Sequence, residues 1–190
     1  MEFNLVMLGP PGAGKGTQAR RLAESRGVPH ISTGEILREA VQAGTDLGRK
    51  AEMVIEAGQL VSDEIMIDIV NDRLGKDDAR HGFLLDGFPR TVFQADALDN
   101  MLGGREPLVV IDLSVNDDEL VRRLSTRRIC DSCGAITGSL NGKPAVVCDT
   151  CGGSLKQRSD DREEVVRQRL VVYRQSTEQL IGYYQQRPTF

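Results

Sequence analysis

The sequence predicts an α/β fold in which helices cover a parallel sheet, interrupted by two insertions. Three short apolar runs, Phe3 to Leu8, Phe83 to Leu85 and Leu108 to Leu113, are typical of buried parallel strands. A weaker fourth strand is predicted over residues 28–31, and helical patterns lie between the runs. Because a glycine-rich loop follows the first run, we expect a P-loop core of three layers built on a doubly wound sheet.

Length and composition indicate one domain with small insertions. The chain has 190 residues, and no apolar run approaches the ~20 residues that cross a membrane. The first run passes directly into the glycine loop without a leader pattern, so we expect a cytoplasmic protein with no membrane partner. The net charge of −4 argues against a nucleic-acid partner. Nothing in the sequence indicates an obligate oligomer, so we expect a monomer.

The loop after the first strand has the composition of a phosphate-binding loop. It reads Gly9-Pro10-Pro11-Gly12-Ala13-Gly14-Lys15-Gly16-Thr17. Glycines allow backbone N–H groups to surround an anion, the following helix adds positive charge, and Lys15 would reach the outer phosphates. Gly16 stands where the general motif has Ser or Thr, with Thr17 one residue later, so no metal-ligand role is assigned to that hydroxyl. A glycine-rich turn without a ligand is the alternative.

Two insertions, residues 32–61 and residues 129–161, interrupt the alternation of strands and helices. The first contains two helical pieces that end near Gly44 and Gly58, and the second contains four cysteines and several turn signals. Each insertion is a candidate lid over the phosphate site. The rest of the chain forms the predicted core, comprising residues 1–31, 62–128 and 162–190.

Two further helices are predicted within the core. One begins at Asp63 and ends near Gly75. A longer one runs from about Asp161 to Tyr184, with acidic residues in its first turn that favour the helix dipole.

Four cysteines form two pairs at close to the spacing of a zinc ribbon. The pairs are Cys130-Asp131-Ser132-Cys133 and Cys148-Asp149-Thr150-Cys151, with fourteen residues between them. Cys130, Cys133, Cys148 and Cys151 are therefore predicted to bind a structural Zn²⁺, because four thiolates complete its coordination shell. Disulfide pairing is the alternative, which reducing conditions in the cytosol oppose.

Charged side chains end one predicted strand and flank the cysteines. Asp86 follows Phe83 to Leu85, a position at which an acid of a P-loop enzyme helps to hold Mg²⁺. An Asp that only starts a turn is the alternative. Arg90 follows at the crevice where ligands of open α/β sheets bind. Several arginines flank the second insertion, namely Arg123, Arg127, Arg128, Arg158, Arg162, Arg167 and Arg169. Most are expected to be solvated side chains on a helix surface, but those that bracket the two hinges of the insertion are placed to close on bound phosphates.

Together these residues closely resemble adenylate kinase of the bacterial type with a zinc-bearing lid, over nearly the whole chain. The resemblance rests on the glycine loop, on Ser32 to Arg38, on Asp86 to Thr91 with Gln94, on the flanking arginines and on the four cysteines. It implies reversible phosphoryl transfer from Mg-ATP to AMP, giving two ADP by direct in-line transfer without a covalent intermediate. The implied partners are ATP, AMP and ADP, and the implied cofactors are Mg²⁺ with ATP and a structural Zn²⁺.

The resemblance also assigns roles to individual positions. The residues implied to act in catalysis are Lys15, Asp86, Arg90, Arg123, Arg127, Arg158 and Arg169. Those implied to bind ATP are Gly12, Ala13, Gly14, Lys15, Gly16, Thr17, Arg123 and Arg127. Those implied to bind AMP are Thr33, Arg38, Gly58, Gln59, Leu60, Val61, Gly87, Arg90, Gln94, Arg158 and Arg169. Residues 32–61 would thus be the AMP-binding insertion, and residues 129–161 the zinc-binding lid.

Gln94 has two interpretations, and two features depart from the family pattern. Thr91-Val92-Phe93-Gln94 fits a helix capping box, in which Gln94 would bond to the backbone of Thr91. The resemblance favours adenine recognition, because a Gln amide can pair with both edge groups of that base. Glu35 stands where the family usually has Asp, and the family continues beyond the position of Phe190 with another strand and helix. We expect these elements to be absent, with weaker ATP-base recognition and lower stability than in a relative that has them.

Three other functions stay open. A kinase for another nucleoside monophosphate would share the phosphate machinery, although Thr33 and Gln94 favour AMP. A nucleic-acid-binding ATPase would need phosphate and stacking contacts, yet residues 134–147 contain one basic residue, Lys143, and no aromatic residue. A purely structural zinc protein would leave the glycine loop unexplained.

Overall fold

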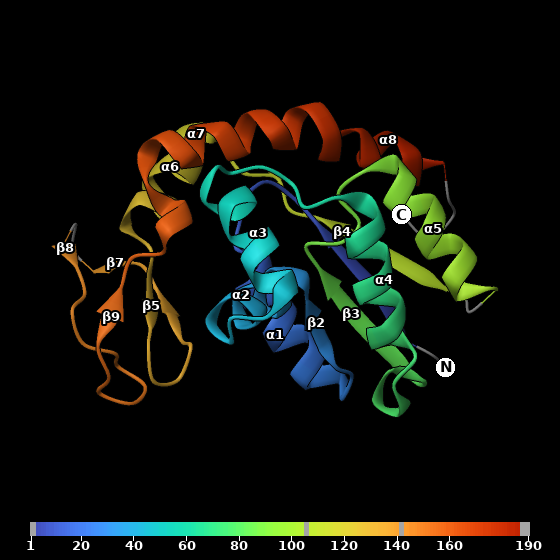
Figure 1. Cartoon of the computed structure of the whole chain (residues 1–190), viewed down its shortest axis with the longest axis horizontal. Helices are drawn as coiled ribbons and strands as arrows, with labels where there is room; N and C mark the ends of the chain where they lie inside the picture. Colours follow the sequence, from blue (N-terminus) through green and yellow to red (C-terminus); the bar gives the residue numbers. More distant parts are fainter. Residues whose placement is uncertain (1–2, 105–106, 141–142, 187–190) are drawn as a thin grey trace.

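A four-stranded parallel sheet lies at the centre of the molecule (Figure 1). The computed structural model describes residues 3–104, 107–140 and 143–186. The strand order of this sheet is β2-β3-β1-β4. Its strands are β1 (Phe3–Leu8), β2 (His30–Ser32), β3 (Gly82–Asp86) and β4 (Leu108–Asp112).

Strand β1 lies in the interior of the sheet and pairs in parallel with both β3 and β4. Leu5 lies opposite Leu84 of β3 and Val109 of β4. All residues of β3 are buried, as expected for a parallel strand covered on both faces. The predicted parallel sheet is therefore confirmed, although β2 begins at His30 and not at residue 28. Pro29 has no N–H to donate, and its carbonyl accepts the Leu84 N–H just outside the strand.

Helices cover both faces of the sheet. Successive apolar side chains of β1 point to opposite faces, so each face needs a covering layer that buries them. The helices around the sheet are α1 (Lys15–Arg26), α4 (Asp63–Leu74), α5 (Val92–Leu102), α6 (Asp117–Thr126), α7 (Glu163–Val172) and α8 (Gln179–Gln185). Val6 and Leu8 pack with residues of α4, α5 and α8, whereas Leu5 and Met7 pack with α1. Helices α6 and α7 share a smaller core beside the glycine loop. Across the described residues, no helix is long and apolar enough to span a membrane.

The two helices of the first insertion pack closely against each other. They are α2 (Thr33–Gln42) and α3 (Asp46–Glu56), and Gly44 lies in the turn between them. A Cβ on Gly48 would lie 2.0 Å from the Ala40 carbonyl oxygen, so only glycine permits this approach of α3 to α2. Ser32 and Thr45 cap the two helices, since the side-chain oxygen of each accepts a backbone N–H.

The described residues between 128 and 156, called the cysteine module below, form a small antiparallel unit at one end of the molecule, away from α5 (Figure 1). Its three-stranded sheet has the order β6-β5-β9, and β7 pairs with β8. The strands are β5 (Arg128–Cys130), β6 (Ile136–Thr137), β7 (Ser139–Leu140), β8 (Lys143–Pro144) and β9 (Leu155–Lys156). This arrangement returns the second cysteine pair to the first, as a zinc ribbon requires.

The segment after the cysteine module runs along the top of the molecule and ends beside α5 (Figure 1). The sequence predicts one helix from about Asp161 to Tyr184. The structure has a short 3-10 turn, η2 (Ser159–Asp161), then α7, then a π-helical turn, η3 (Tyr173–Thr177), and then α8. Periodicity does not reveal the π turn, because it changes the hydrogen-bond spacing without ending the helix. A further short turn, η1 (Asp77–Ala79), precedes β3, and within the described residues β4 is an edge strand of the central sheet.

Replacing Leu98 with Ala should lower the free energy of unfolding by about 2–5 kcal/mol, because the side chain is fully buried on α5 and its removal leaves a cavity. Phe93→Ala on the same helix is the matched control. The Phe93 side chain is 60% exposed, so its loss should cost less than about 1 kcal/mol. Urea unfolding followed by circular dichroism measures both values, and equal losses would contradict the assigned core.

Candidate active site

The glycine loop connects β1 to the first turn of α1. Gly12 and Gly14 have φ values of 88° and 99°, a region that favours glycine, and Gly14 is the N-cap residue of α1. A Cβ on Gly12 would also lie 2.9 Å from the Leu124 side chain, so a larger residue would push against α6. The predicted context of strand, loop and helix is thus present, and the helix N-terminus favours an anion in the loop.

Lys15 begins α1 and bonds back to the glycine loop. Its Nζ donates to the carbonyl oxygens of Gly9 at 2.6 Å and Pro10 at 3.0 Å. Loss of hydration lowers the pKa of Lys15 to about 8, although the nearby Asp86 carboxylate acts in the opposite direction. A cation with little water around it interacts strongly with an incoming phosphate.

Asp86 ends β3 directly beside the glycine loop. A Cβ on Gly16 would lie 3.3 Å from Asp86 Oδ2, and His30 Nε2 lies 3.5 Å from the same oxygen. Burial alone would raise the pKa of Asp86, but His30 and Lys15 outweigh it and hold the pKa below its usual value. The carboxylate therefore stays charged, and its oxygens are of the kind that Mg²⁺ prefers.

A first cavity, of about 130 Å³, is bordered by the first insertion, the central sheet and the C-terminal helices. Thr33 lies at its wall, where its hydroxyl donates to the Gly87 carbonyl at 2.9 Å. Arg158 is the one predicted AMP-binding residue that does not line this cavity. The others do, namely Thr33, Arg38, Gly58, Gln59, Leu60, Val61, Gly87, Arg90, Gln94 and Arg169.

A second cavity, of about 370 Å³, lies between the glycine loop and the cysteine module. Ile136 and Thr137 of β6 line it from the side of the module. Ala13 differs from the other predicted ATP-binding residues, because its side chain is buried against α6 and only its backbone could contact a ligand. The predicted residues that line this cavity are Gly12, Gly14, Lys15, Gly16, Thr17, Arg123 and Arg127.

The two cavities share a cationic wall made by Lys15, Arg38, Arg90 and Arg169. Arg158 lines the second cavity beside this wall. Burial, with the repulsion of neighbouring arginines, lowers the pKa of Arg90 to about 10 and that of Arg158 to about 9. Both guanidinium groups therefore remain charged at neutral pH. A phosphate at the junction of the cavities would have cations on several sides.

Two buried acids hold the flanking arginines in place. Arg127 donates from Nε to the Asp161 carboxylate at 2.7 Å and from a second nitrogen to the same group. Arg169 lies 2.9 Å from the Asp160 carboxylate and donates to the Asp160 carbonyl at 3.0 Å. Burial alone would raise the pKa of Asp160, but Arg169 and Arg127 hold it below its usual value. Within the described part of the chain, the buried Nε of Arg158 has no hydrogen-bond partner.

Arg123 lies at the edge of the second cavity. Its Nε donates to Glu119 at 2.7 Å, and 44% of its side chain is exposed. This partner is on the solvent side of α6, so Arg123 could turn toward a nucleotide at low cost. The remaining predicted arginines line neither cavity, namely Arg128, Arg162 and Arg167.

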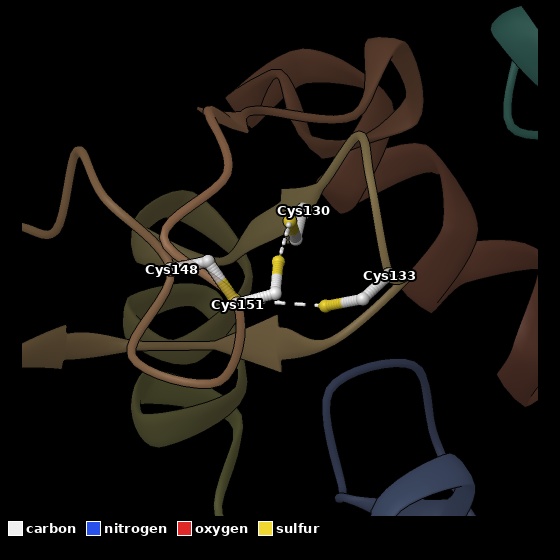
Figure 2. A group of neighbouring side chains, drawn as sticks. All are labelled: Cys130, Cys133, Cys148 and Cys151. Atoms are coloured by element: carbon white, nitrogen blue, oxygen red, sulfur yellow. Dashed lines mark hydrogen bonds between the residues drawn. The ribbon is translucent and has the colours of Figure 1, made fainter.

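The four cysteine sulfurs converge within the cysteine module (Figure 2). All lie within 4.8 Å of one another, with 3.5 Å between the sulfurs of Cys130 and Cys151 and 3.7 Å between those of Cys133 and Cys148. Tetrahedral Zn²⁺ with bonds of about 2.3 Å places its sulfurs about 3.8 Å apart, so these thiols could hold zinc. All four are free thiols. Backbone hydrogen bonds from Cys151 and Thr150 lower the pKa of Cys148 to about 6, whereas hydrogen bonds with the neighbouring thiols raise the pKa of Cys151. Cys148 is therefore the more readily ionised of these two thiols.

Gln94 occupies a capping position and also lines the first cavity. Its backbone N–H donates to Thr91 Oγ1 at 3.1 Å, as the capping box predicts. Its side-chain Oε1 accepts from the backbone N–H of Arg90 at 2.8 Å, and not from Thr91. The hydrogen bond from the Gln94 N–H to the Thr91 side chain therefore confirms one half of the capping box. In the other half, the Gln94 side chain accepts from the backbone of Arg90, one residue before the expected Thr91.

Several contributors to the site carry no sequence signal. Thr177, in the π-helical turn, donates from its hydroxyl to the Arg90 carbonyl at 2.9 Å. Tyr173 of the same turn lines the first cavity. His30, to which the sequence assigns no role, lies beside Asp86. These contacts join segments far apart in the chain, so local patterns could not reveal them.

The glycine loop at the end of β1, on a parallel sheet with covering helices, defines a P-loop nucleotide-binding protein. The family model of adenylate kinase matches residues 7–189. Adenylate kinases from Archaeoglobus fulgidus and Moorella thermoacetica are 52% and 53% identical over 189 residues, which cover 97% of this chain and 87% of each relative. One from Thermosipho africanus is 51% identical over 187 residues, covering 96% of this chain and 87% of that protein. The chain belongs to the adenylate kinase family, which uses Mg²⁺ with ATP.

ATP binding should take up protons above pH 8. In the protein without a nucleotide the pKa of Lys15 is about 8, so its amine is mostly neutral at pH 9. Bound phosphates favour the charged form of the amine. Calorimetry at pH 9 in two buffers of different ionisation enthalpy should show uptake of roughly half a proton or more. Lys15→Arg should take up clearly fewer protons, since the guanidinium at position 15 stays charged and only neighbours such as Arg158, with a pKa of about 9, can still gain a proton. Equal uptake by both proteins would disprove the assignment.

The same shift in the pKa of Lys15 affects folding. The pKa is lower in the folded state than in the unfolded chain, so the unfolded chain binds more protons between pH 8 and the ordinary value of 10.5. The contribution of Lys15 to the free energy of unfolding should therefore rise with pH across this window.

Proposed function

We propose that this protein transfers a phosphoryl group reversibly between Mg-ATP and AMP, forming two ADP. The observation that carries the proposal is the cationic wall common to two cavities. A donor phosphate in the second cavity and an acceptor phosphate in the first would meet at this wall. Membership of the adenylate kinase family supports the same pair of substrates.

The proposed chemistry is direct in-line transfer without a covalent intermediate. A phosphate oxygen of AMP is already anionic, so its attack needs no general base. Catalysis then consists of alignment and charge neutralisation, for which Lys15, Arg90 and the other wall residues are suited. Asp86 would help to hold Mg²⁺, which neutralises charge on the donor phosphates.

Individual residues divide between the two nucleotides in this proposal. Arg38 and Arg90 would bind the AMP phosphate, because both line the first cavity. Arg123 and Arg127 would bind ATP phosphates in the second cavity, together with the glycine loop. Arg158 lines the second cavity beside the wall, so it would contact the group in transfer.

We propose that both insertions act as moving parts on the core of residues 1–31, 62–128 and 162–190. Residues 32–61 would close over AMP, and residues 129–161 would close over ATP. Closure would exclude water, which competes with AMP as the acceptor. The four cysteines would hold a structural Zn²⁺, since a shell filled by thiolates leaves no position for a substrate.

We further propose a cytoplasmic monomer with no nucleic-acid or membrane partner. Four free thiols fit a reducing compartment, and a net charge of −4 disfavours binding to nucleic acid.

A coupled assay that offers AMP, CMP, UMP and GMP with Mg-ATP tests the proposed reaction. We expect AMP to be preferred over each other acceptor by about tenfold or more in kcat/KM. Preference for a pyrimidine nucleotide would identify a different monophosphate kinase. ATP hydrolysis stimulated by nucleic acid, without transfer to AMP, would identify an ATPase.

In the same assay, Arg158→Met should lower kcat/KM by about 100-fold or more, because this guanidinium is placed to neutralise charge in transfer. The stability of the Arg158→Met protein should change little, since the Nε of Arg158 has no hydrogen-bond partner among the described residues. Arg127→Met is the matched variant. It should lose both activity and stability, because it leaves the fully buried Asp161 carboxylate without its closest cation. Similar stability losses in the two variants would count against these roles.

Metal analysis of freshly purified, reduced protein should find about one zinc ion per chain. Cys148→Ser should lower the zinc content and the melting temperature, while the rate of phosphoryl transfer by the folded enzyme changes far less. Ser154→Ala in the same module, which removes no thiol, is the control. Protein that contains no metal would refute the zinc site, and iron or cobalt would revise it.

A further inference from the structure

We infer that Asp63 sets the base specificity of the first cavity by fixing the orientation of the Gln94 amide. The inference rests on the proposed function, in which Gln94 contacts the base of AMP. Asp63 begins α4, two residues after the segment 58–61 that lines the first cavity. It acts through another side chain, so it is a positioning residue.

Both oxygens of the Asp63 carboxylate accept hydrogen bonds from the start of α5. Oδ1 accepts from Gln94 Nε2 at 2.7 Å, and Oδ2 accepts from Thr91 Oγ1 at 2.9 Å. On the other side of the amide, Gln94 Oε1 accepts from the Arg90 backbone N–H at 2.8 Å. The Arg90 carbonyl is held in turn by the Thr177 hydroxyl at 2.9 Å. The Gln94 amide therefore lies between a fixed acceptor and a fixed donor.

These partners favour one orientation of the Gln94 amide. An amide turned over would place Oε1 against the Asp63 carboxylate and its NH₂ against the Arg90 N–H. Two hydrogen bonds would become two repulsive contacts, in a side chain that is only 1% exposed. The amide of a glutamine without such neighbours can adopt either orientation.

The fixed amide leaves one N–H and one oxygen lone pair for a ligand. The edge of adenine offers an acceptor at N1 and a donor at the 6-amino group, which match this pair. A 6-oxo purine has the reverse pattern, a donor at N1 and an acceptor at O6, so a fixed amide cannot satisfy both groups. A site whose polar groups are fixed rejects a ligand that leaves them unpaired. Asp63 would thereby favour adenine over hypoxanthine and guanine.

Asp63 also lies in the first turn of α4, where any acid favours the helix dipole. Glu64 shares that turn, is exposed, and is not among the partners of Gln94. Glu64→Ala is therefore a matched control, since it removes a charge from the same turn without touching the amide.

The experiment compares AMP with inosine monophosphate as acceptors for Mg-ATP in the wild type, Asp63→Ala and Glu64→Ala. Kinetic constants and the melting temperature are measured for each protein. Wild type should prefer AMP, and Asp63→Ala should lower the AMP-to-inosine ratio of kcat/KM by about tenfold or more. The change should appear mainly as a higher KM for AMP and a lower KM for inosine monophosphate. Glu64→Ala should keep the wild-type ratio.

Asp63→Asn provides a second variant with the same side-chain shape, in case the Ala variant does not fold. Its neutral amide can pair with Gln94 in either orientation, so the ratio should fall by about threefold or more. An unchanged ratio in the Asp63 variants, or an equal fall in Glu64→Ala, would overturn the inference. Equal use of both acceptors by wild type would also overturn it while leaving phosphoryl transfer intact. A wild type that does not phosphorylate AMP would refute the proposed function instead.

Discussion

The parallel pairing of β1 with β3 is the constraint on which the rest of the site depends. Its register places Met7 opposite Asp86, so the glycine loop after β1 and the Gly87 to Arg90 segment after β3 leave the sheet at the same edge. Lys15 and Asp86 lie together for this reason. A shift of one residue would exchange the side chains on the two covered faces of β3 and separate the carboxylate from the loop. The apolar side chains of both strands therefore fix the register, and the register fixes the chemistry.

Basic side chains outnumber acidic ones at this edge of the sheet. Asp160 and Asp161 neutralise the arginines that enter from α7 and from the end of α6. Arg38, Arg90 and Arg158 have no ion pair within the described residues. Their depressed pKa values record the cost of gathering cations away from water. A phosphate relieves that cost, so the same arrangement that opposes folding favours the binding of a nucleotide.

Helix α7 connects the parts of the molecule that would move in the proposed reaction. Asp161, just before α7, holds Arg127 at the entry to the cysteine module. Gln157 bridges the two chain segments at that entry, because its Nε2 donates to the Asp161 carbonyl at 3.0 Å and to the Ser125 carbonyl at 3.4 Å. At the first insertion, a Cβ on Gly58 would lie 3.0 Å from the Arg169 side chain. A displacement of α7 would therefore shift the contacts of both insertions, through packed side chains at the first and a buried ion pair at the second.

The sequence by itself determined the features that depend on neighbouring residues. The glycine loop, the buried strands and the two cysteine pairs each carry their signal within a few positions, because backbone torsion, burial and metal spacing are local requirements. Only the tertiary structure decided which half of the capping box Gln94 completes, that a π turn brings Thr177 to Arg90, and that Asp63 holds the Gln94 amide. These contacts join segments that only the folded sheet brings together. Their geometry follows from packing across the whole core, which no local pattern records.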